Sequence, residues 1–235
     1  MTDRRNDHGQ PIGPDVPGWT GRAPIPRTAM QGRYCDMVPL ETSHAADLHG
    51  AYSADKTGAI WTYMPTGPFS SLSEVEAWVK TCSQSTDPLF FAIIDKRNGK
   101  AIGVASFLRM APANGVAEVG YIAFSPSLQK TPMATEAMYL MMHRVLGDLG
   151  YRRYEWKCDA LNAASRAAAA RLGFSYEGTF RQALVYKGRN RDTAWFSIID
   201  SEWPPIRTAM ETWLNPANFD ENGQQRHSLS HFMPR

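Results

Sequence analysis

Hydrophobic residues recur along residues 132–149 with the spacing of an α-helix. Ala134, Met138 and Met141 follow one another at intervals of four and three residues, which places them on one face of a helix. Gly150 comes directly after this stretch, and glycine commonly ends helices because it adopts the left-handed conformation easily. The pattern therefore predicts an amphipathic helix whose apolar face packs on a core.

Shorter apolar runs, bounded by turn-forming residues, predict β-strands on both sides of this helix. The predicted strands are residues 33–40, 90–95, 101–110, 116–124, 154–158, 174–180 and 194–200. Further helices are expected over residues 43–54, 74–83, 163–172 and 204–214. Strands and helices alternate late in the chain, so we expect a mixed sheet with helices on both faces.

Cap signals support the starts of three predicted helices. Ser43 is expected to cap the first of them, and Ser73 followed by Glu76 has the pattern of a capping box. Asn162 is a suitable N-cap for the helix over 163–172, and Ser165 could bond back to it. A capped helix that follows a strand presents its free N–H groups at one edge of a sheet.

The two ends of the chain are patterned differently from its middle. Residues 1–31 are rich in proline and glycine, which interrupt helices and central strands, so we expect an extended arm. Residues 215–235 are polar and weakly patterned, and we expect a tail there. Residues 32–214 then form a single domain, long enough for one substantial core.

Composition narrows the class of protein. Of 235 residues 43% are hydrophobic, which is typical of a globular domain, and no apolar run approaches the ~20 residues of a membrane helix. The polar N-terminus does not resemble a secretory signal, and three distant cysteines indicate a reducing cytoplasm. The six histidines lack metal-ligand spacing, and a net charge of +2 gives no reason to expect nucleic acid.

The turn between the strand 116–124 and the long helix is a candidate anion site. Free N–H groups and the positive end of a helix dipole favour a diphosphate there, and Lys130 adds charge. Pro132 removes one donor, and the turn alone is equally compatible with an ordinary strand-to-helix connection. The residues of this candidate site are Gln129, Lys130, Thr131, Pro132, Met133, Ala134 and Thr135.

Several motifs occur together over residues 33–203. They are Ala117-Glu-Val-Gly-Tyr-Ile122, Gln129-x-x-Pro-x-Ala134, Asn162-x-x-Ser165 with Leu172-Gly-Phe174, and Arg191-Asp192 before Trp195. In combination they resemble the GNAT superfamily of N-acetyltransferases, and within it the RimJ/RimL-like branch that modifies ribosomal-protein N-termini. The chain departs from the family pattern at Pro132, where a glycine is expected.

The resemblance implies an α/β (α+β) fold with a mixed, mostly antiparallel central sheet and helices on both faces. It also implies a V-shaped split between the strands 116–124 and 154–158 that holds acetyl-CoA or another acyl-CoA, without a metal. The pyrophosphate would lie on the turn 129–135, and the backbone of Ile122, Ala123 and Phe124 would pair with the pantetheine arm. Asn162 and Ser165 would complete the cofactor site.

Acyl transfer to an amine needs a proton acceptor, an oxyanion donor and a partner for the departing thiolate. The resemblance makes Glu118 the candidate base and the backbone N–H of Phe124 the oxyanion donor. Many relatives carry a tyrosine acid at the position of Ala169, so Ser165 is the expected partner of the thiolate here. Glu118 could instead make a structural hydrogen bond, Ser165 could only cap its helix, and proximity alone could suffice.

An aromatic loop and a basic turn are candidates for the acceptor site. Similar proteins form the acceptor wall from the region of Trp61, Tyr63 and Phe69, to which Tyr121 and Arg191 would add. The alternatives are a loop packed on the core and a solvated hairpin tip. The expected acceptor is a small-molecule amine or a peptide or protein N-terminus, with no nucleic acid or membrane partner, and both tails are compatible with a homodimer.

Two function classes remain open. The first is an acyl-CoA-dependent N-acyltransferase of the cytoplasm, with acetyl as the expected group. The second is a non-catalytic CoA-binding or sensor domain, which Pro132 and Ala169 keep open. A dinucleotide-binding enzyme is disfavoured because no G-x-G-x-x-G follows an early strand.

Overall fold

A single twisted sheet organises the protein. The computed structural model describes residues 4–234, and within them eight strands pair in the order β1-β2-β3-β4-β5-β6-β8-β7. Neighbouring strands are antiparallel except β5 and β6, so the predicted mixed, mostly antiparallel sheet is confirmed. The strands are β1 Met30–Gln31, β2 Cys35–Pro39, β3 Leu89–Asp95, β4 Lys100–Ala111, β5 Val116–Phe124, β6 Arg153–Asp159, β7 Ser175–Tyr186 and β8 Arg189–Ile199.

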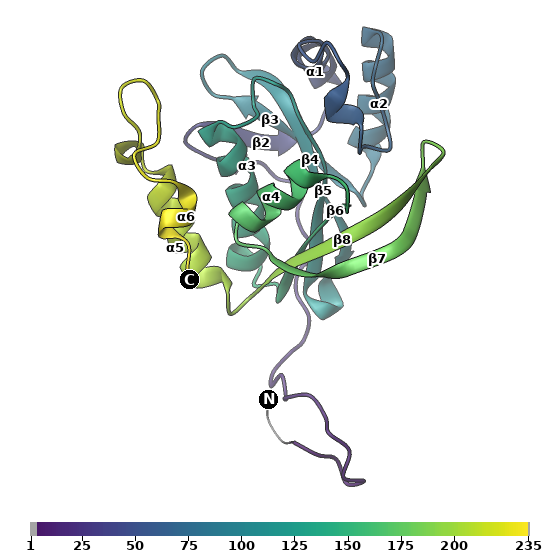
Figure 1. The fold of residues 1–235 in the computed structure, drawn as a ribbon, viewed down its shortest axis with the longest axis vertical. Coiled ribbons are helices and arrows are strands. Elements are labelled where there is room, and N and C mark those ends of the chain that lie inside the picture. Colours follow the sequence, from purple (N-terminus) through teal and green to yellow (C-terminus); the bar gives the residue numbers. More distant parts are fainter. Residues whose placement is uncertain (1–3, 235) are drawn as a thin grey trace.

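Helices lie on both sides of this sheet (Figure 1). The α-helices are α1 Ala45–Tyr52, α2 Leu72–Gln84, α3 Pro132–Met142, α4 Ala163–Arg171, α5 Trp203–Leu214 and α6 Leu229–Phe232. Short 3-10 helices are η1 Thr42–His44, η2 Ala59–Trp61, η3 Pro112–Asn114 and η5 Pro216–Asn218, and η4 His143–Asp148 is a π-helix. The helices predicted from the periodicity are therefore all present.

Alternation along β3 separates two hydrophobic cores. Phe91 and Ile93 belong to the larger core, which includes α3 and α5, whereas Phe90 and Ala92 belong to a smaller core with α1 and α2. Successive side chains of a strand point to opposite faces, so these two cores cover opposite faces of the sheet. This strand is buried on both sides, which explains its nearly continuous apolar sequence.

The sheet opens between β5 and β6. These strands pair over four positions, from Val116 opposite Arg153 to Val119 opposite Trp156, although both continue further. Beyond that point β5 contains a bulge against β4, at which Tyr121 has a φ of +49°. A bulge increases twist and bends the strand, so it turns β5 away from β6 and confirms the predicted V-shaped split.

Several local expectations require correction. Ser43 does not cap α1; Glu41 caps the preceding η1, because the Glu41 side chain and His44 form a reciprocal box. The cap of α2 is Ser71, which accepts the N–H of Glu74 at 3.3 Å, two residues before the predicted pair. The helix predicted over 132–149 changes from α to π geometry after residue 142.

The hairpin formed by β7 and β8 is longer than predicted. The sequence indicated strands at 174–180 and 194–200 only, but pairing continues to Tyr186 and Arg189 at the tip. Side chains of β7 are exposed along nearly the whole strand, so no alternation of buried and exposed residues marks its outer half. In Figure 1 this hairpin extends past the rest of the sheet.

The ends of the chain differ in their attachment. Trp19 donates to the carbonyl of Ala113 at 2.8 Å and Arg22 to that of Gly150 at 2.6 Å, while the preceding residues extend away from the body (Figure 1). Within 215–234, Leu229 is 1% exposed and belongs to the larger core. The C-terminal segment thus packs on the domain through α6.

Candidate active site

A pocket of about 350 Å³ lies in the split between β5 and β6. Its walls come from the end of β4, the bulge of β5, the end of β6, the start of α4, η2 with the loop after it, and the outer part of the β7–β8 hairpin. Six segments of the chain therefore meet where two strand ends separate. Clefts at such positions are common ligand sites.

The start of α4 forms one wall, and its hydrogen bonds assign the roles of Asn162 and Ser165. Asn162 Oδ1 accepts the backbone N–H of Ser165 at 3.0 Å, so the predicted cap is confirmed. The Ser165 hydroxyl does not bond back to Asn162; its Oγ accepts from Trp156 Nε1 at 3.0 Å. A hydroxyl that accepts here retains its own hydrogen for another partner in the pocket.

The turn after β5 leaves backbone donors available. Thr131 caps α3, because its Oγ1 accepts the N–H of Ala134 at 3.3 Å. The N–H groups of Lys130, Thr131 and Met133 make no hydrogen bond within residues 4–234. Pro132 occupies the first turn as expected, so this helix end can receive an anion despite one missing donor.

Two side chains of this turn are engaged elsewhere. Thr135 is buried, and its hydroxyl accepts from Arg171 Nη1 at 3.1 Å, so it faces the interior rather than the turn. Gln129 Nε2 donates to the carbonyl of Phe124 at 2.9 Å, which ties the turn to the end of β5. The side chain of Thr135 therefore does not contribute to the predicted anion site.

The backbone of Phe124 points into the split. Ser125 donates its N–H to Ile102 at 3.3 Å, which makes those two residues a hydrogen-bonded pair. Pair types alternate along an antiparallel ladder, so the adjacent pair of Phe124 and Gly103 is not hydrogen-bonded. The N–H of Phe124 is thus directed away from β4, as its predicted role as an oxyanion donor requires.

Only part of the predicted pantetheine strand lines the pocket. Ile122 does so, within the bulge where β5 loses its register with β4. Ala123 is buried, remains opposite Val104 and accepts from the Tyr52 hydroxyl at 3.1 Å. Besides the N–H of Phe124, the backbone that is unpaired with β4 therefore lies at Tyr121 and Ile122, earlier in the strand than Ala123.

Glu118 lies in the pocket with two cationic partners. Glu118 is 3% exposed, and its Oε2 contacts Arg109 Nη1 at 2.6 Å and Lys157 Nζ at 2.8 Å. Lys157 also contacts Glu155 Oε2 at 2.7 Å and lies 3.6 Å from the ring centroid of Trp195. The buried Glu118 is therefore held by ion pairs. This favours the alternative that Glu118 has a structural role over its role as the base.

Sequence reasoning missed Arg109 and Lys157. Arg109 has a φ of +48° at an irregularity in β4, and Asp87 accepts the N–H groups of Arg109 and Met110 at 2.9 and 3.2 Å. Such a conformation is costly for arginine, so this local geometry is held by Asp87. At both positions a charged residue occurs within a largely apolar strand, and this could have marked Arg109 and Lys157 as candidate site residues.

The aromatic loop is divided between core and cleft. Trp61 is 3% exposed, and its ring packs edge-on against Tyr52 and Phe69, each at 5.0 Å. Neither Trp61 nor Phe69 lines the pocket, so the prediction that they stack on an acceptor is corrected. Tyr63, Tyr121 and Arg191 do line it, and the Tyr63 hydroxyl donates to Leu161 at 3.2 Å.

The hairpin tip is bound over the cleft by a group of contacts that we call the clasp. Lys187 Nζ donates to the carbonyls of Trp61, Thr66 and Gly67 at 2.9, 3.2 and 2.7 Å. Arg189 Nη2 donates to the carbonyl of Thr62 at 2.7 Å. Burial, followed by the nearby Arg189, lowers the pKa of Lys187. The tip is therefore not simply solvated.

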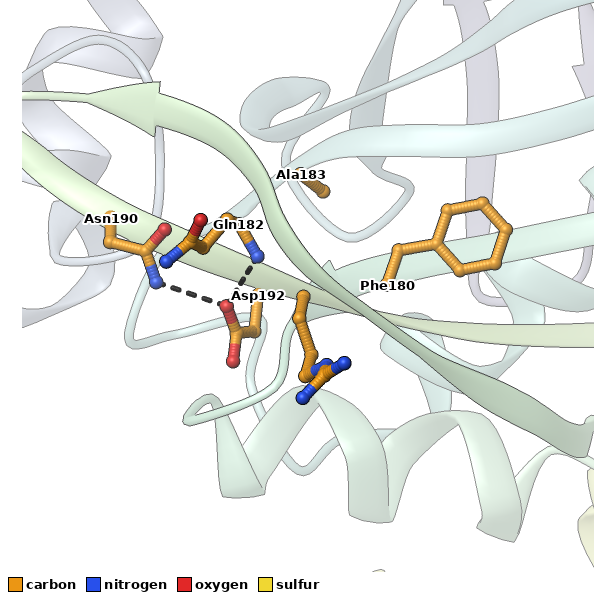
Figure 2. Close-up of a pocket in the computed structure, with 6 residues that line it drawn as sticks. Phe180, Gln182, Ala183, Asn190 and Asp192 are labelled. Atoms are coloured by element: carbon orange, nitrogen blue, oxygen red, sulfur yellow. Dashed lines mark hydrogen bonds between the residues drawn. The ribbon is translucent and has the colours of Figure 1, made fainter.

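A second hollow is lined by residues 180–183 of β7 and by Asn190 and Asp192 of β8 (Figure 2). It forms where Gln182 adopts a φ of +51° and donates its N–H to Asp192 Oδ1 at 2.7 Å. Arg181 lines this hollow, not the cleft, and most of its lining is exposed. This hollow therefore results from the register irregularity between Phe180 and Leu184 of β7, and we place the chemistry in the split between β5 and β6.

The position counted as the family's tyrosine acid is in the core. Ala169 is fully buried among the residues of the larger core.

In the described part of the chain, no helix is long and apolar enough to cross a membrane. The same residues contain no group of three or more His, Cys, Asp or Glu side chains placed to hold a metal ion.

Comparison with known proteins agrees with this geometry. Residues 36–175, more than half of the chain, match the family model described as the acetyltransferase (GNAT) domain. The chain belongs to the GNAT family. The resemblance found in the motifs is thereby confirmed.

Relatives of this GNAT protein include solved structures. A GCN5-related N-acetyltransferase from Brucella melitensis is 47% identical, with a TM-score of 0.90 over 92% of this chain and 99% of that one. The microcin C7 self-immunity acetyltransferase MccE, solved in complex with acetyl-CoA and AMP, shares the fold at 24% identity. Its TM-score is 0.62 over 72% of this chain and 93% of that one.

A curated relative covers less of the chain. The ribosomal-protein-serine acetyltransferase of Escherichia coli (strain K12) is 33% identical over 107 residues. That match spans 45% of this chain and 59% of the relative, which is less than two thirds of its length. Its name agrees with the RimJ/RimL-like branch expected from the motifs.

Proposed function

We propose that this protein is an acetyl-CoA-dependent N-acetyltransferase that transfers the acetyl group to a primary amine by direct attack in a ternary complex. The split between β5 and β6 carries this proposal, because an N–H of Phe124 is directed into it. The bulge at Tyr121 and Ile122 provides unpaired backbone for a pantetheine arm. A thioester carbonyl near the Phe124 N–H would have its developing negative charge stabilised.

The two ends of the split suit the rest of the cofactor. The free N–H groups of Lys130, Thr131 and Met133 would hold the diphosphate at the positive end of α3. Asn162 and Ser165, at the start of α4, lie at the other wall of the pocket. When bound, acetyl-CoA supplies an activated acyl group whose leaving thiolate is stable.

Ser165 and Glu118 take different parts in the proposed reaction. The Ser165 hydroxyl, which accepts from Trp156, would donate its hydrogen to the departing sulfur. Glu118 was the base predicted from the sequence. Given its contacts, we propose that Glu118 instead holds Arg109 and Lys157 in place at the cleft.

The acceptor is proposed to be a small-molecule amine or a protein N-terminus. Tyr63, Tyr121 and Arg191 lie where it would bind, beneath the clasp. The name of the E. coli relative gives an N-terminal serine as one candidate. We propose that residues 32–214 form the catalytic domain and that it acts in the cytoplasm. A homodimer remains a prediction.

A CoA-binding sensor is the second candidate. It is favoured by Pro132 in the diphosphate turn and by the absence of a tyrosine at Ala169, since both depart from the family pattern. Binding without turnover would be its signature.

Thiol release separates the two functions. The protein is incubated with acetyl-CoA and a panel comprising a serine-initiated peptide, a free amino acid, an aromatic amine and a polyamine. We expect acetyl-CoA to raise the melting temperature and at least one amine to give free CoA thiol. A melting shift without thiol release from any amine would contradict the transferase and support the sensor.

A further inference from the structure

Alternation along β6 assigns its side chains to two sides of the cleft. Trp156 and Cys158 belong to the larger core, and Trp156 bonds Ser165 of α4. The side chains between and after them, Lys157 and Asp159, therefore project from the opposite face. The partner of Asp159 there is Tyr186, at the tip of β7, and both line the pocket.

Asp159 is a buried carboxylate without a cationic partner. It is 4% exposed, its Oδ1 accepts the N–H of Leu161 at 2.9 Å, and its Oδ2 accepts the hydroxyl of Tyr186 at 2.8 Å. None of the ion pairs found among the described residues involves Asp159. Glu118 differs because two cations share one of its oxygens.

The direction of the hydrogen bonds distinguishes the two hydroxyls of the pocket. Tyr186 has one hydrogen and donates it to Asp159, so its remaining lone pairs can only accept from a ligand. Ser165 accepts from Trp156 and keeps its hydrogen as a donor, which the neighbouring Cys158 thiol shares with any ligand in the pocket. Burial, then Asp159, raises the pKa of Tyr186 to about 12, which keeps the phenol protonated near neutral pH.

We propose that Tyr186 accepts the proton of the attacking amine while it transfers its own hydrogen to Asp159. The nitrogen–carbon bond forms and the carbon–sulfur bond breaks. The amine proton goes to the phenol oxygen, the phenol hydrogen to Asp159 Oδ2, and the electron pair of the broken bond to sulfur, which Ser165 stabilises. Asp159 then returns its proton to water, and the thiolate takes one from water. This path rests on the proposed acetyl transfer.

Two substitutions test the path with little change of shape. Tyr186→Phe removes the oxygen and Asp159→Asn removes the charge, and each is assayed with acetyl-CoA and the best amine of the panel. We expect kcat to fall about 10²–10³-fold, within the range typical of general acid–base catalysis, with KM for acetyl-CoA changed less than about threefold. The double variant should be no slower than the slower single variant, because the two groups act as a unit.

Matched controls separate chemistry from folding. Tyr176 lies on the same strand, is 52% exposed, and its hydroxyl bonds that of Thr179 outside the pocket. The kcat of the Tyr176→Phe variant should therefore stay within about twofold of the wild-type value. Circular dichroism and the acetyl-CoA melting shift verify that Tyr186→Phe is folded and binds the donor. The kcat of a folded Asp159→Asn variant tests the same proton path independently of Tyr186→Phe.

Two results would overturn the path while leaving the transferase intact. One is an active wild type whose folded Tyr186→Phe variant keeps a third or more of its kcat. The other is a double variant whose losses multiply. A wild type that binds acetyl-CoA but releases no thiol with any amine would overturn both proposals together.

Discussion

At the scale of single residues, Ser165 has two separable roles. Its backbone N–H satisfies the cap of α4 through Asn162, whereas its hydroxyl faces Trp156 and the cleft. Capping therefore does not use the side chain of Ser165. The sequence could not separate these roles, because Asn-x-x-Ser is compatible with either.

This separation leads to a prediction for Ser165→Ala. The variant keeps the N–H that Asn162 accepts, but loses the donor to the thiolate, so we expect kcat to fall about 10–100-fold, in line with the ~1.5–3 kcal/mol of a hydrogen bond to a charged group. Steady-state thiol release measures the loss, and Ser165→Thr, which keeps a hydroxyl, should recover part of it. Wild-type kcat in the folded alanine variant would contradict the assignment.

At the scale of elements, the turn between β1 and β2 is held by a carboxylate from α3. Glu136 is buried and accepts the backbone N–H groups of Arg33, Tyr34 and Cys35 at 2.7, 2.6 and 2.8 Å. Gly32 approaches so closely that a Cβ there would lie 2.6 Å from the Glu136 carboxyl and 2.5 Å from the Cys35 carbonyl. Position 32 of the turn therefore has no room for a side chain.

We expect Gly32→Ala to destabilise the fold by about 3 kcal/mol, the upper end of overpacking penalties. That corresponds to a melting temperature about 6–12 °C lower in a protein of this size. Gly50→Ala is the control, because Gly50 lies in α1 with no atom near the new Cβ, and alanine favours a helix. Equal melting temperatures for wild type and Gly32→Ala would refute this view of the turn.

Elements with clear periodicity were the ones that the sequence predicted well. β5 has the predicted bounds, β3 begins one residue earlier than predicted, and β4 is one residue longer at each end. The outer half of β7 was missed because it is exposed on both faces, and Ser43 was mistaken for a cap because Glu41 and His44 satisfy that helix end. Hydrophobic patterns in the sequence arise from burial, so they cannot predict a strand that has no buried face.

At the scale of the whole molecule, the clasp links segments more than 100 residues apart. The ammonium of Lys187 donates to the carbonyl of Trp61 at the end of η2 and to those of Thr66 and Gly67 in the loop that follows, so the hairpin tip and this loop together cover the cleft. Loss of that donor leaves the carbonyls to water and loosens both segments.

Lys187→Met should therefore raise amide hydrogen exchange over residues 59–67 about tenfold, which equals ~1.4 kcal/mol of local opening. Exchange read by mass spectrometry measures this, and Lys80→Met, an exposed lysine of α2, is the matched control. Unchanged exchange in the Lys187→Met variant would show that the clasp does not close the cleft.

The composition of the candidate site was harder to predict than its place. Motifs located the split, the cap at Asn162 and the turn at residues 129–135, since each is a local pattern. The contact of Glu118 with Lys157 depends on the register of β5 and β6, and that of Asp159 with Tyr186 on the hairpin tip. A pattern of neighbouring residues carries no information about such register.

The four residue pairs that join β5 to β6 also have a mechanical meaning. They are the only ladder between a half-sheet of β1 to β5 and a half-sheet of β6 to β8 within the described residues. A force that pulls the two half-sheets apart would act on this short β5–β6 ladder, here called the seam, and would break it before any longer ladder. A ligand that bonds both edges beyond the seam would lengthen it, so tensile strength across the sheet should rise with occupancy.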